Sequence, residues 1–152
     1  MRLTTRTNLA MRALMVCAVN PGRIVRKHEI AGACNASENH LAQVVNTLSQ
    51  LGFIDTQRGR AGGMQLARPM NQIGVGEVFR AFETGIPFAE CFNPGANTCP
   101  LVSACRLRDA LVAALDAFHA ALDRLTLADL VADNAELDRL LKFSDRRMLA
   151  CA

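Results

Sequence analysis

The chain of 152 residues is 51 % hydrophobic and 20 % charged, and its formal net charge is +3. These proportions are typical of a globular domain with a core of its own and exclude an intrinsically disordered chain. The sequence has no apolar run near the ~20 residues of a membrane span and no export signal at its start, so we expect a cytoplasmic protein with reduced cysteines.

The charge is distributed unevenly along the chain. Residues 1–70 hold nine basic and three acidic residues and so carry +6, whereas residues 71–152 hold eight basic and eleven acidic residues and so carry −3. A basic N-terminal half favours a polyanionic partner such as DNA, although a merely solvated basic face would give the same excess.

Three helices are predicted in the basic half, at residues 4–20, 27–34 and 38–51. Ser37 is the expected N-cap of the third helix, and Gly52 lies at its usual C-cap position. Two helices joined by a tight turn, the second with polar residues on its exposed N-terminal side, are typical of a helix-turn-helix. The residues of this motif that we predict to contact DNA are Ser37, Asn39, His40 and Gln43.

A β-hairpin is predicted directly after the third helix. Residues 53–58 form its first strand, residues 59–63 form a tip rich in glycine and arginine, and residues 64–66 return. A hairpin in this place makes the motif a winged helix. We expect the glycines to let the backbone approach a phosphate or a groove and Arg58 and Arg60 to supply positive charge, whereas the same segment standing alone would be an ordinary flexible turn.

A fourth helix is predicted at residues 75–84, and a long helix runs from just after Cys105 to about Leu125. Apolar residues of the long helix alternate at spacings of four and three, which is typical of a helix that pairs with another helix. We interpret this pattern as the contact between two copies of the chain, because a winged helix has a small core of its own; packing within the same chain is the alternative. From Thr126 onward we expect a short helix and a weakly ordered end.

Three of the six cysteines, Cys91, Cys99 and Cys105, lie within fifteen residues around an Asn/Pro/Gly-rich loop. Pro100 suits the first position of a helix, so Cys99 is expected at a helix N-terminus, which stabilises a thiolate. Buried free thiols and a disulfide are alternatives. Zinc requires four closed ligands, and no nearby Cys/His pair completes that set, whereas iron–sulfur clusters are compatible with three cysteines and one labile ligand. The spacing favours a metal site, with an iron–sulfur cluster ahead of zinc.

Four segments together resemble the Rrf2 family of bacterial transcription regulators, and within it the NsrR group of nitric-oxide-sensing repressors. They are residues 37–41, 58–63, 73–78 and 126–134, and the resemblance extends from residue 1 to about 141. It implies a homodimer with two winged-helix domains and a long dimerising helix. It also implies a cluster held by Cys91, Cys99 and Cys105, and repression of genes for nitric oxide detoxification.

Two features depart from the NsrR pattern. The seven residues between Cys91 and Cys99 exceed the usual gap and resemble the rhizobial iron regulator RirA. Some NsrR proteins have an Asp at position 8 that reaches the cluster of the partner chain, whereas this chain has Asn8. Asn8 of the partner is therefore the candidate for the fourth cluster ligand. The IscR proteins, which belong to the family that this chain resembles, use a His three residues after their last Cys as a cluster ligand. This chain has Arg108 at that position, so that ligand is absent. The cluster type therefore stays open between [4Fe–4S] and [2Fe–2S].

The combined prediction is a mainly α protein that is not an enzyme. Residues 1–84 form a winged helix-turn-helix DNA-binding domain, residues 85–105 a cluster-binding loop, and residues 106–152 the dimerisation helix and tail. The protein binds double-stranded operator DNA and releases it when nitric oxide nitrosylates the cluster. An iron-responsive or redox-responsive regulator of the same family is the alternative. A small electron-transfer protein is an alternative of another class, but the winged helix and the lack of a second cofactor motif argue against it.

Overall fold

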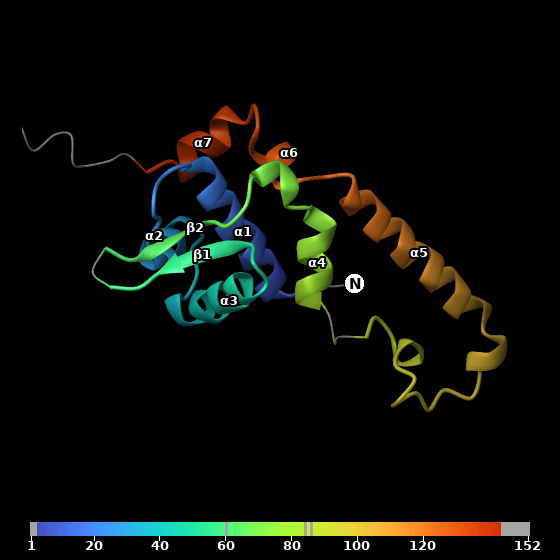
Figure 1. The fold of residues 1–152 in the computed structure, drawn as a ribbon. Helices are drawn as coiled ribbons and strands as arrows, with labels where there is room; N and C mark the ends of the chain where they lie inside the picture. Colours follow the sequence, from blue (N-terminus) through green and yellow to red (C-terminus); the bar gives the residue numbers. More distant parts are fainter. Residues whose placement is uncertain (1–2, 60, 84, 86, 144–152) are drawn as a thin grey trace, which may run out of the picture.

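The computed structural model describes residues 3–59, 61–83, 85 and 87–143, and in these residues the fold is helical apart from one two-stranded hairpin (Figure 1). The prediction of a mainly α fold is confirmed. The helices and strands, in chain order, are α1 (Thr5–Val19), α2 (Lys27–Ala33), α3 (Glu38–Gln50), β1 (Ile54–Gln57), β2 (Gly63–Leu66), α4 (Val75–Glu83), α5 (Arg106–Asp123), α6 (Leu127–Val131) and α7 (Ala135–Leu141). Short 3₁₀ turns lie at Met70–Gln72, Glu90–Phe92 and Val102–Ala104.

Helix α1 is the centre of the core. It is apolar on most of its surface, and a helix of that kind is stable only when other elements cover it on several sides. Helices α3, α4, α6 and α7 and strand β2 all pack against it. Its N-terminus is capped by Thr4, whose side chain accepts a hydrogen bond of 3.1 Å from the backbone N–H of Thr7. The rest of the fold is arranged around this helix.

The turn between α2 and α3 is held by backbone contacts. Asn35 has a φ of 47°, a left-handed conformation that asparagine tolerates better than most residues. The N–H of Ala36 donates to the carbonyl of Ala31 at 2.9 Å, and the Arg12 guanidinium donates to the carbonyl of Cys34 at 3.2 Å. Ser37 occupies the N-cap of α3 without a capping hydrogen bond from its side chain. The turn is therefore fixed mainly by α1 and the backbone.

The hairpin pairs Ile54 with Leu66 at one end and Gln57 with Gly63 at the other. Val25, before α2, joins the edge of β2 through two backbone hydrogen bonds of 2.8 Å with Met64. A Cβ on Gly63 would overlap the carbonyl of Val25. This glycine is therefore required by packing inside the protein, a reason for its presence that differs from the expected approach to a phosphate.

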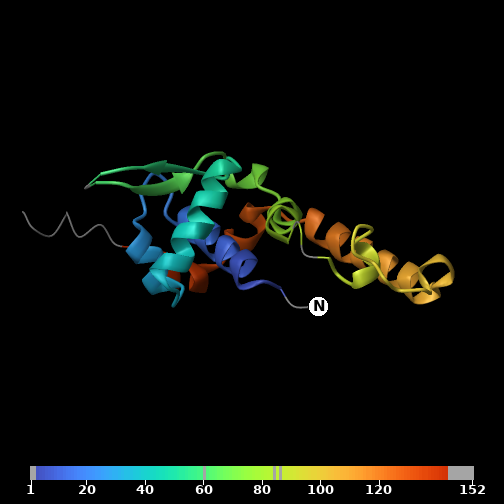
Figure 2. The same ribbon diagram turned by 90° about the horizontal axis from the view of Figure 1, so that it is seen from below.

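Helix α5 projects away from the remainder of the molecule, and the cysteine loop runs beside its far end (Figures 1 and 2). We call residues 87–124 the arm, and we call residues 3–59, 61–83 and 125–143 the head. The predicted helix start at Pro100 is wrong, because Pro100 lies in a turn and α5 begins at Arg106 with Cys105 as its N-cap. No residue of α5 is buried.

The chain returns to the head after α5. Leu127, Val131 and Leu141 are buried there, so α6 and α7 complete the core around α1. Asn20, at the C-cap of α1, donates from Nδ2 to the carbonyl of Leu141 at 2.8 Å and accepts a 2.9 Å hydrogen bond from the N–H of Phe143. The expectation of a weakly ordered end is therefore wrong for α7, and residues 144–152 lie outside the described part. Within the described residues, no helix is long and apolar enough to span a bilayer.

Candidate DNA-binding surface and cysteine loop

The N-terminal half of α3 presents polar side chains to solvent. Asn39, His40 and Gln43 are all exposed, and Ser37 is exposed at the N-cap. The opposite face of the helix is buried in the core through Leu41, Val44 and Leu48. The four residues predicted to contact DNA therefore lie together at one end of a helix that is held rigidly from behind, and the N-terminus of a helix favours the approach of phosphate groups.

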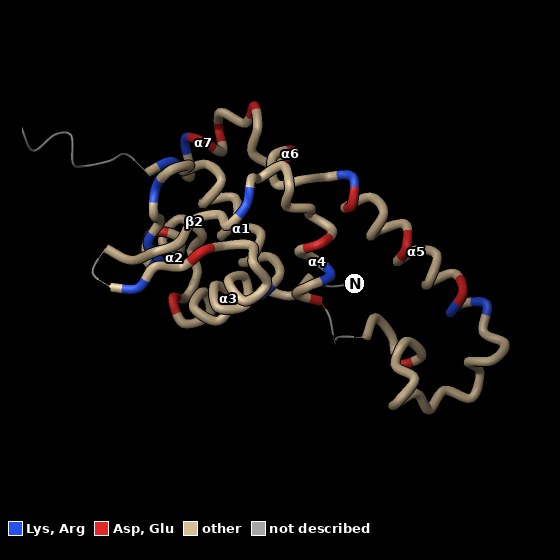
Figure 3. Tube along the Cα trace, viewed as in Figure 1, with Lys and Arg blue, Asp and Glu red and all other residues tan. Residues whose placement is uncertain are grey.

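The wing extends the same end of the head, on the side away from the arm (Figures 1 and 2). Arg58 is exposed at the end of β1, directly before Gly59, whose φ of 103° only glycine adopts readily. Arg60, the other predicted basic contact, lies outside the described residues. Basic residues occur around α2 and the hairpin, whereas acidic residues are spaced along α5 (Figure 3). The charge asymmetry of the sequence does not separate head from arm, however, because acidic residues of the second half such as Glu77, Glu83 and Asp138 lie in α4 and α7 of the head.

Asn8, the proposed ligand for the cluster of a partner chain, lies on the exposed side of α1. It lines a hollow of about 370 Å³ together with Arg12, Ser37 and His40. The structure therefore brings Asn8 next to the start of α3, which the sequence spacing did not suggest. Any group that reaches Asn8 also lies beside two residues of the predicted DNA-binding surface.

A carboxylate closes the cysteine loop. Glu90 accepts hydrogen bonds of 2.6 Å from both the backbone N–H and the hydroxyl of Thr98, and these bonds lower the pKa of its carboxyl group. Glu90 precedes Cys91 and Thr98 precedes Cys99, so the bond holds the segments of two cysteines together. The N–H of Cys99 in turn donates to the side-chain oxygen of Asn97 at 3.1 Å.

Arg108 connects the start of the loop to α5. Its Nε donates to the carbonyl of Cys91 at 3.4 Å, and its guanidinium lies 6.0 Å from the centre of the Phe92 ring. Its backbone N–H points at Sγ of Cys105 at 3.4 Å, which is the N-cap contact of the helix. The sequence comparison drew attention to Arg108 only as a missing ligand, whereas the structure shows that it joins the segments that carry two of the three cysteines.

The donor chemistry of Cys91, Cys99 and Cys105 fits a soft metal or an iron–sulfur cluster, because all three thiols are free and half-buried on one loop. The described residues contain no three His, Cys, Asp or Glu side chains close enough to hold a metal ion. The three cysteines are therefore suitable ligands by chemical type, but their thiols do not converge on one point in this structure.

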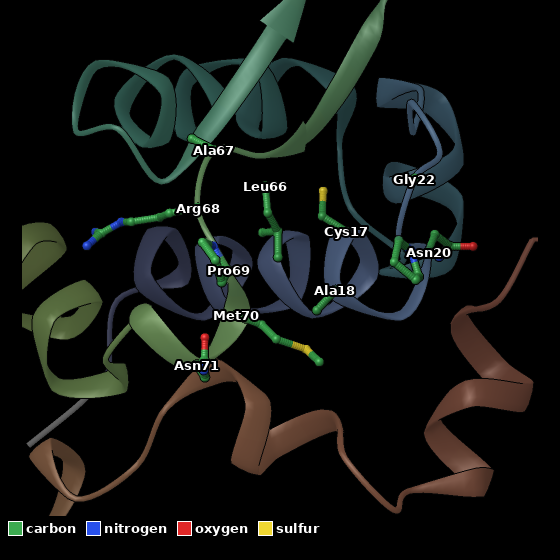
Figure 4. A pocket seen from close by; sticks show the side chains of 11 residues that line it. Cys17, Ala18, Asn20, Gly22, Leu66, Ala67, Arg68, Pro69, Met70 and Asn71 are labelled. Atoms are coloured by element: carbon green, nitrogen blue, oxygen red, sulfur yellow. The ribbon is translucent and has the colours of Figure 1, made fainter.

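The thiols of the head have a different character. Burial raises the pKa of Cys17 to about 12, and it also raises the pKa of Cys34. Cys17 borders the hollow of about 690 Å³ shown in Figure 4, between the end of α1 and residues 66–71. Arg68 points away from that hollow, toward an ion pair of 2.8 Å with Glu77. This hollow therefore offers a protonated thiol and apolar walls, and no set of groups suited to acid–base chemistry converges among its described lining residues.

Comparison with known proteins identifies relatives that share most of the chain. The Rrf2 family profile, described as an iron-dependent transcriptional regulator, matches residues 3–133. The HTH-type transcriptional regulator NsrR of Geobacillus kaustophilus is 43 % identical over 93 % of this chain and 97 % of its own length. Protein aau3 of Rhizobium meliloti is 42 % identical over 93 % of this chain and 92 % of its own length. The structure of T. potens IscR shares the fold, with a TM-score of 0.70 and 22 % identity over 97 % of this chain and 96 % of that one.

Proposed function

The chain belongs to the Rrf2 family of transcriptional regulators, and from this premise we propose that it is a homodimeric repressor that senses nitric oxide through an iron–sulfur cluster. Its class as a DNA-binding transcriptional regulator follows from the family. The observation that carries the finer proposal is the near full-length match to a regulator named NsrR, joined to three free thiols on the arm. The sequence motifs resemble the same group of nitric-oxide-sensing repressors.

For the reading of DNA, we propose that the exposed half of α3 enters the major groove. His40 and Gln43 carry donors and acceptors that suit the edges of bases, and helices of winged-helix proteins enter the groove with their N-terminal residues. Arg58 on the wing supplies a charge for a phosphate, which adds affinity without sequence selection. The rigid packing of Leu41, Val44 and Leu48 supports this role, since a reading helix must keep its orientation.

For sensing, we propose that Cys91, Cys99 and Cys105 hold the cluster, with Asn8 of the second copy as the candidate for a further ligand. A cluster held there by three thiolates would leave at least one iron with a weaker ligand, and that iron would be open to a small diatomic molecule. The chain contributes the bonds that keep the loop together, from Glu90 to Thr98 and from Arg108 to the start of the loop. Asn8 borders the hollow at the start of α3, which supports a coupling between ligation and DNA reading.

For assembly, we propose that two copies associate through the arm. Leu107 in α5 is 66 % exposed, Leu101 before the helix is 67 % exposed, and α5 has no buried residue, so the arm presents exposed apolar side chains in a single chain. Surfaces of this kind commonly pack against a second copy. Two heads joined in this way would read two related half-sites of one operator.

The proposal is tested with protein purified without oxygen and bound to a fluorescent duplex that the wild type selects from random DNA. A few equivalents of nitric oxide per cluster should release the duplex within minutes, and a mild iron chelator should act far more slowly. Protein in which the three arm cysteines are alanine is the control, and nitric oxide should leave its residual DNA binding unchanged. A wild-type protein that keeps its DNA while nitric oxide bleaches its absorption would contradict the proposal.

The same experiment separates the second candidate, an iron-responsive regulator. The seven residues between Cys91 and Cys99 favour that candidate, since this gap resembles the rhizobial iron regulators. Rapid release of DNA by the chelator, together with no release by nitric oxide, would assign the chain to iron sensing. Mössbauer and absorption spectra of the same preparation would identify the cluster type.

A further inference from the structure

We propose that Gly76, Arg80 and Asp123 form a joint that sets the angle between α5 and the head, and that this angle determines the half-site spacing which two joined heads can read. The second part of this inference rests on the proposed dimeric function. The first part concerns a single chain and stands on its contacts.

The joint begins with a close approach between two helices. Gly76 lies in the first turn of α4, and Asp123 is the last residue of α5. A Cβ on Gly76 would overlap Oδ1 of Asp123 and would lie 3.0 Å from its Cγ and 3.1 Å from its backbone nitrogen. The carboxylate of Asp123 therefore occupies the space that any other residue at position 76 would fill. A larger residue at position 76 would therefore have to displace this carboxylate and push the backbone of Asp123 away by a few tenths of an ångström.

Arg80, one turn further along α4, binds the same carboxylate. Its two terminal nitrogens donate to the two oxygens of Asp123, at 2.5 Å and 3.2 Å. Paired bonds of this kind fix an orientation as well as a distance, because the planes of the guanidinium and the carboxylate must align. Both side chains are partly exposed, so the pair adds little to stability. We expect the pair to act mainly on the angle between α5 and the head.

Backbone pairing prevents the joint from sliding. The N–H of Val75 donates to the carbonyl of Leu125 at 2.9 Å, and the N–H of Leu127 donates to the carbonyl of Ile73 at 2.8 Å. These bonds lie on either side of the bridge between Gly74 and Thr126. The end of α5 is thus attached to the start of α4 by backbone bonds, while the pair of Arg80 and Asp123 sets the direction of the helix.

The length of α5 makes small angles important. Its 18 residues span about 27 Å at 1.5 Å per residue. A change of about 10° at the joint therefore moves the far end by roughly 5 Å relative to the head. Half-sites of a dimeric helix-turn-helix protein lie about 34 Å apart, one turn of DNA, so a shift of that size in each copy changes which spacing fits.

The test compares two alanine substitutions in the same motif of the full-length protein. Gly76→Ala places a Cβ on the Asp123 carboxylate and should turn α5. Gly74→Ala is the matched control, because its Cβ would meet nothing nearer than Cβ of Glu77 at 3.6 Å, an ordinary contact. Small-angle X-ray scattering of the free protein should show a changed radius of gyration for Gly76→Ala and the wild-type value for Gly74→Ala.

Asp123→Ala provides a second test, because it removes side-chain atoms and so does not require the fold to accept a larger residue at position 76. It removes the pair with Arg80 and also the side-chain atoms that a Cβ at position 76 would overlap. Because only the 3.1 Å approach to the backbone nitrogen of residue 123 then remains, the double variant of Gly76→Ala and Asp123→Ala should behave nearly like Asp123→Ala alone. Such non-additivity indicates a shared contact and would not arise from two independent losses of stability.

The DNA measurement uses the duplex selected by the wild type and versions whose central spacer is one or two base pairs longer or shorter. Gly76→Ala should bind the original spacing at least tenfold more weakly and prefer another, Gly74→Ala should match the wild type, and Asp123→Ala should discriminate less among spacings. Analytical ultracentrifugation should show the same oligomeric state for all variants.

The outcomes separate the joint from the proposed function. A wild type that neither dimerises nor binds DNA would reject the proposed function, and the scattering comparison would still decide whether the joint sets the angle. A wild type that binds DNA as a dimer, with variants of unchanged shape and unchanged spacing preference, would overturn the joint alone. If Gly76→Ala fails to fold, the comparison of Asp123→Ala with the wild type decides in the same way.

Discussion

In the head, α1 is covered by α3, α4, α6, α7 and β2, whereas in the arm α5 packs mainly on α4 and has no buried residue. The head is stabilised chiefly by apolar side chains that are removed from water, including the fully buried Leu14 and Ile30. The arm is held together by a few polar contacts, such as the 2.6 Å bonds of Glu90 and the 3.4 Å bond of Arg108. The two regions belong to one chain and yet depend on different forces.

The two kinds of contact differ in how much they stabilise the folded chain. A buried Leu side chain contributes roughly 1.5–3 kcal/mol, which is enough to offset part of the entropy lost on ordering the chain. A polar contact in water contributes only about 0.5–1.5 kcal/mol, so a loop built on a few of them is marginal alone. The head is therefore expected to be stable by itself, and the arm is expected to become rigid when a metal cluster or a second copy binds it.

The largest effect is expected from the arm cysteines. Replacing Cys91, Cys99 or Cys105 singly with Ala should abolish stable iron binding, because each variant removes one of the three strong ligands of the proposed site. The measurement is iron and sulfide content of protein purified without oxygen.

The head supplies the matched control for this prediction. Cys17→Ala and Cys34→Ala should keep the iron content of the wild type, since both thiols are buried in the core and have raised pKa values. Wild-type iron content in any one of the three arm variants would remove that cysteine from the site, and loss of iron in both head variants would reject the comparison.

The next largest effect is expected on the free energy of unfolding, where a leucine of the head is compared with a leucine of the arm. Leu14→Ala in the head should lower the free energy of unfolding by about 2–5 kcal/mol, because the side chain is fully buried and leaves a cavity. Leu107→Ala in the arm should change it by less than about 0.5 kcal/mol at low protein concentration, because the side chain is 66 % exposed. Urea unfolding at several protein concentrations measures both, and Leu107→Ala should also weaken association. Equal losses in the two variants at low concentration would show that α5 is already covered in the single chain.

Sequence reasoning succeeded where a local pattern determines the structure. The apolar face of α3 through Leu41, Val44 and Leu48 was readable from helical spacing, and Gly52 ends that helix with a φ of 72°. Thr126 and Asp129 form a reciprocal capping box at α6, which accounts for part of the motif that resembles the family. In these places, the nearest neighbours in the chain decide the conformation.

Sequence reasoning failed where a contact joins distant residues. Nothing in the spacing indicates that Asn20 fixes α7, that Glu83 accepts bonds from Thr4, or that Arg108 reaches the carbonyl of Cys91. The long helix was correctly expected to begin just after Cys105, but the additional helix start expected at Pro100 is wrong, because Pro100 lies in a turn. The three cysteines were identified as one loop from sequence, whereas their degree of convergence depends on the partners of that loop.

A smaller effect is expected on DNA affinity, and it should occur without loss of stability. His40→Ala or Gln43→Ala should each weaken binding of the selected duplex by about 1–3 kcal/mol if the side chain reads a base, because a bidentate contact has that value. Both side chains are exposed, so the free energy of unfolding should stay within about 0.5 kcal/mol of the wild type. Fluorescence anisotropy and urea unfolding measure the two quantities.

Two further variants locate the DNA-binding surface within the head. Arg58→Ala should reduce the salt dependence of binding by about one counterion if it contacts a phosphate. Gln50→Ala is the control, since it is exposed at the opposite end of the same helix and should bind normally. Wild-type affinity in the variants of His40, Gln43 and Arg58 would mean that another surface reads the DNA.

The smallest effect concerns the point where the head meets the arm. Glu83 ends α4, and one of its oxygens accepts hydrogen bonds from the backbone N–H of Thr4 at 3.1 Å, from the hydroxyl of Thr4 at 2.9 Å and from the hydroxyl of the buried Thr7. Burial opposes ionisation of this carboxyl group, but the hydrogen bonds from Thr7 and Thr4 outweigh it, and the pKa is lower than its usual value of 4.5. The charged form therefore favours the folded state.

Glu83→Gln tests this charge, because glutamine keeps one oxygen for the same donors and lacks only the ionised group. We expect the variant to be less stable by about 1 kcal/mol at neutral pH, the difference between a charged and a neutral hydrogen bond. Since the folded pKa is depressed, the contribution is fully present above the unfolded pKa and is lost as the pH falls through the folded pKa. Urea unfolding should thus give a constant difference between the two proteins above about pH 5, and the difference should vanish in more acidic solution. A difference that persists unchanged at pH values well below 4.5 would show that the amide group itself weakens the contact, and that the charge of Glu83 is not what joins α4 to α1.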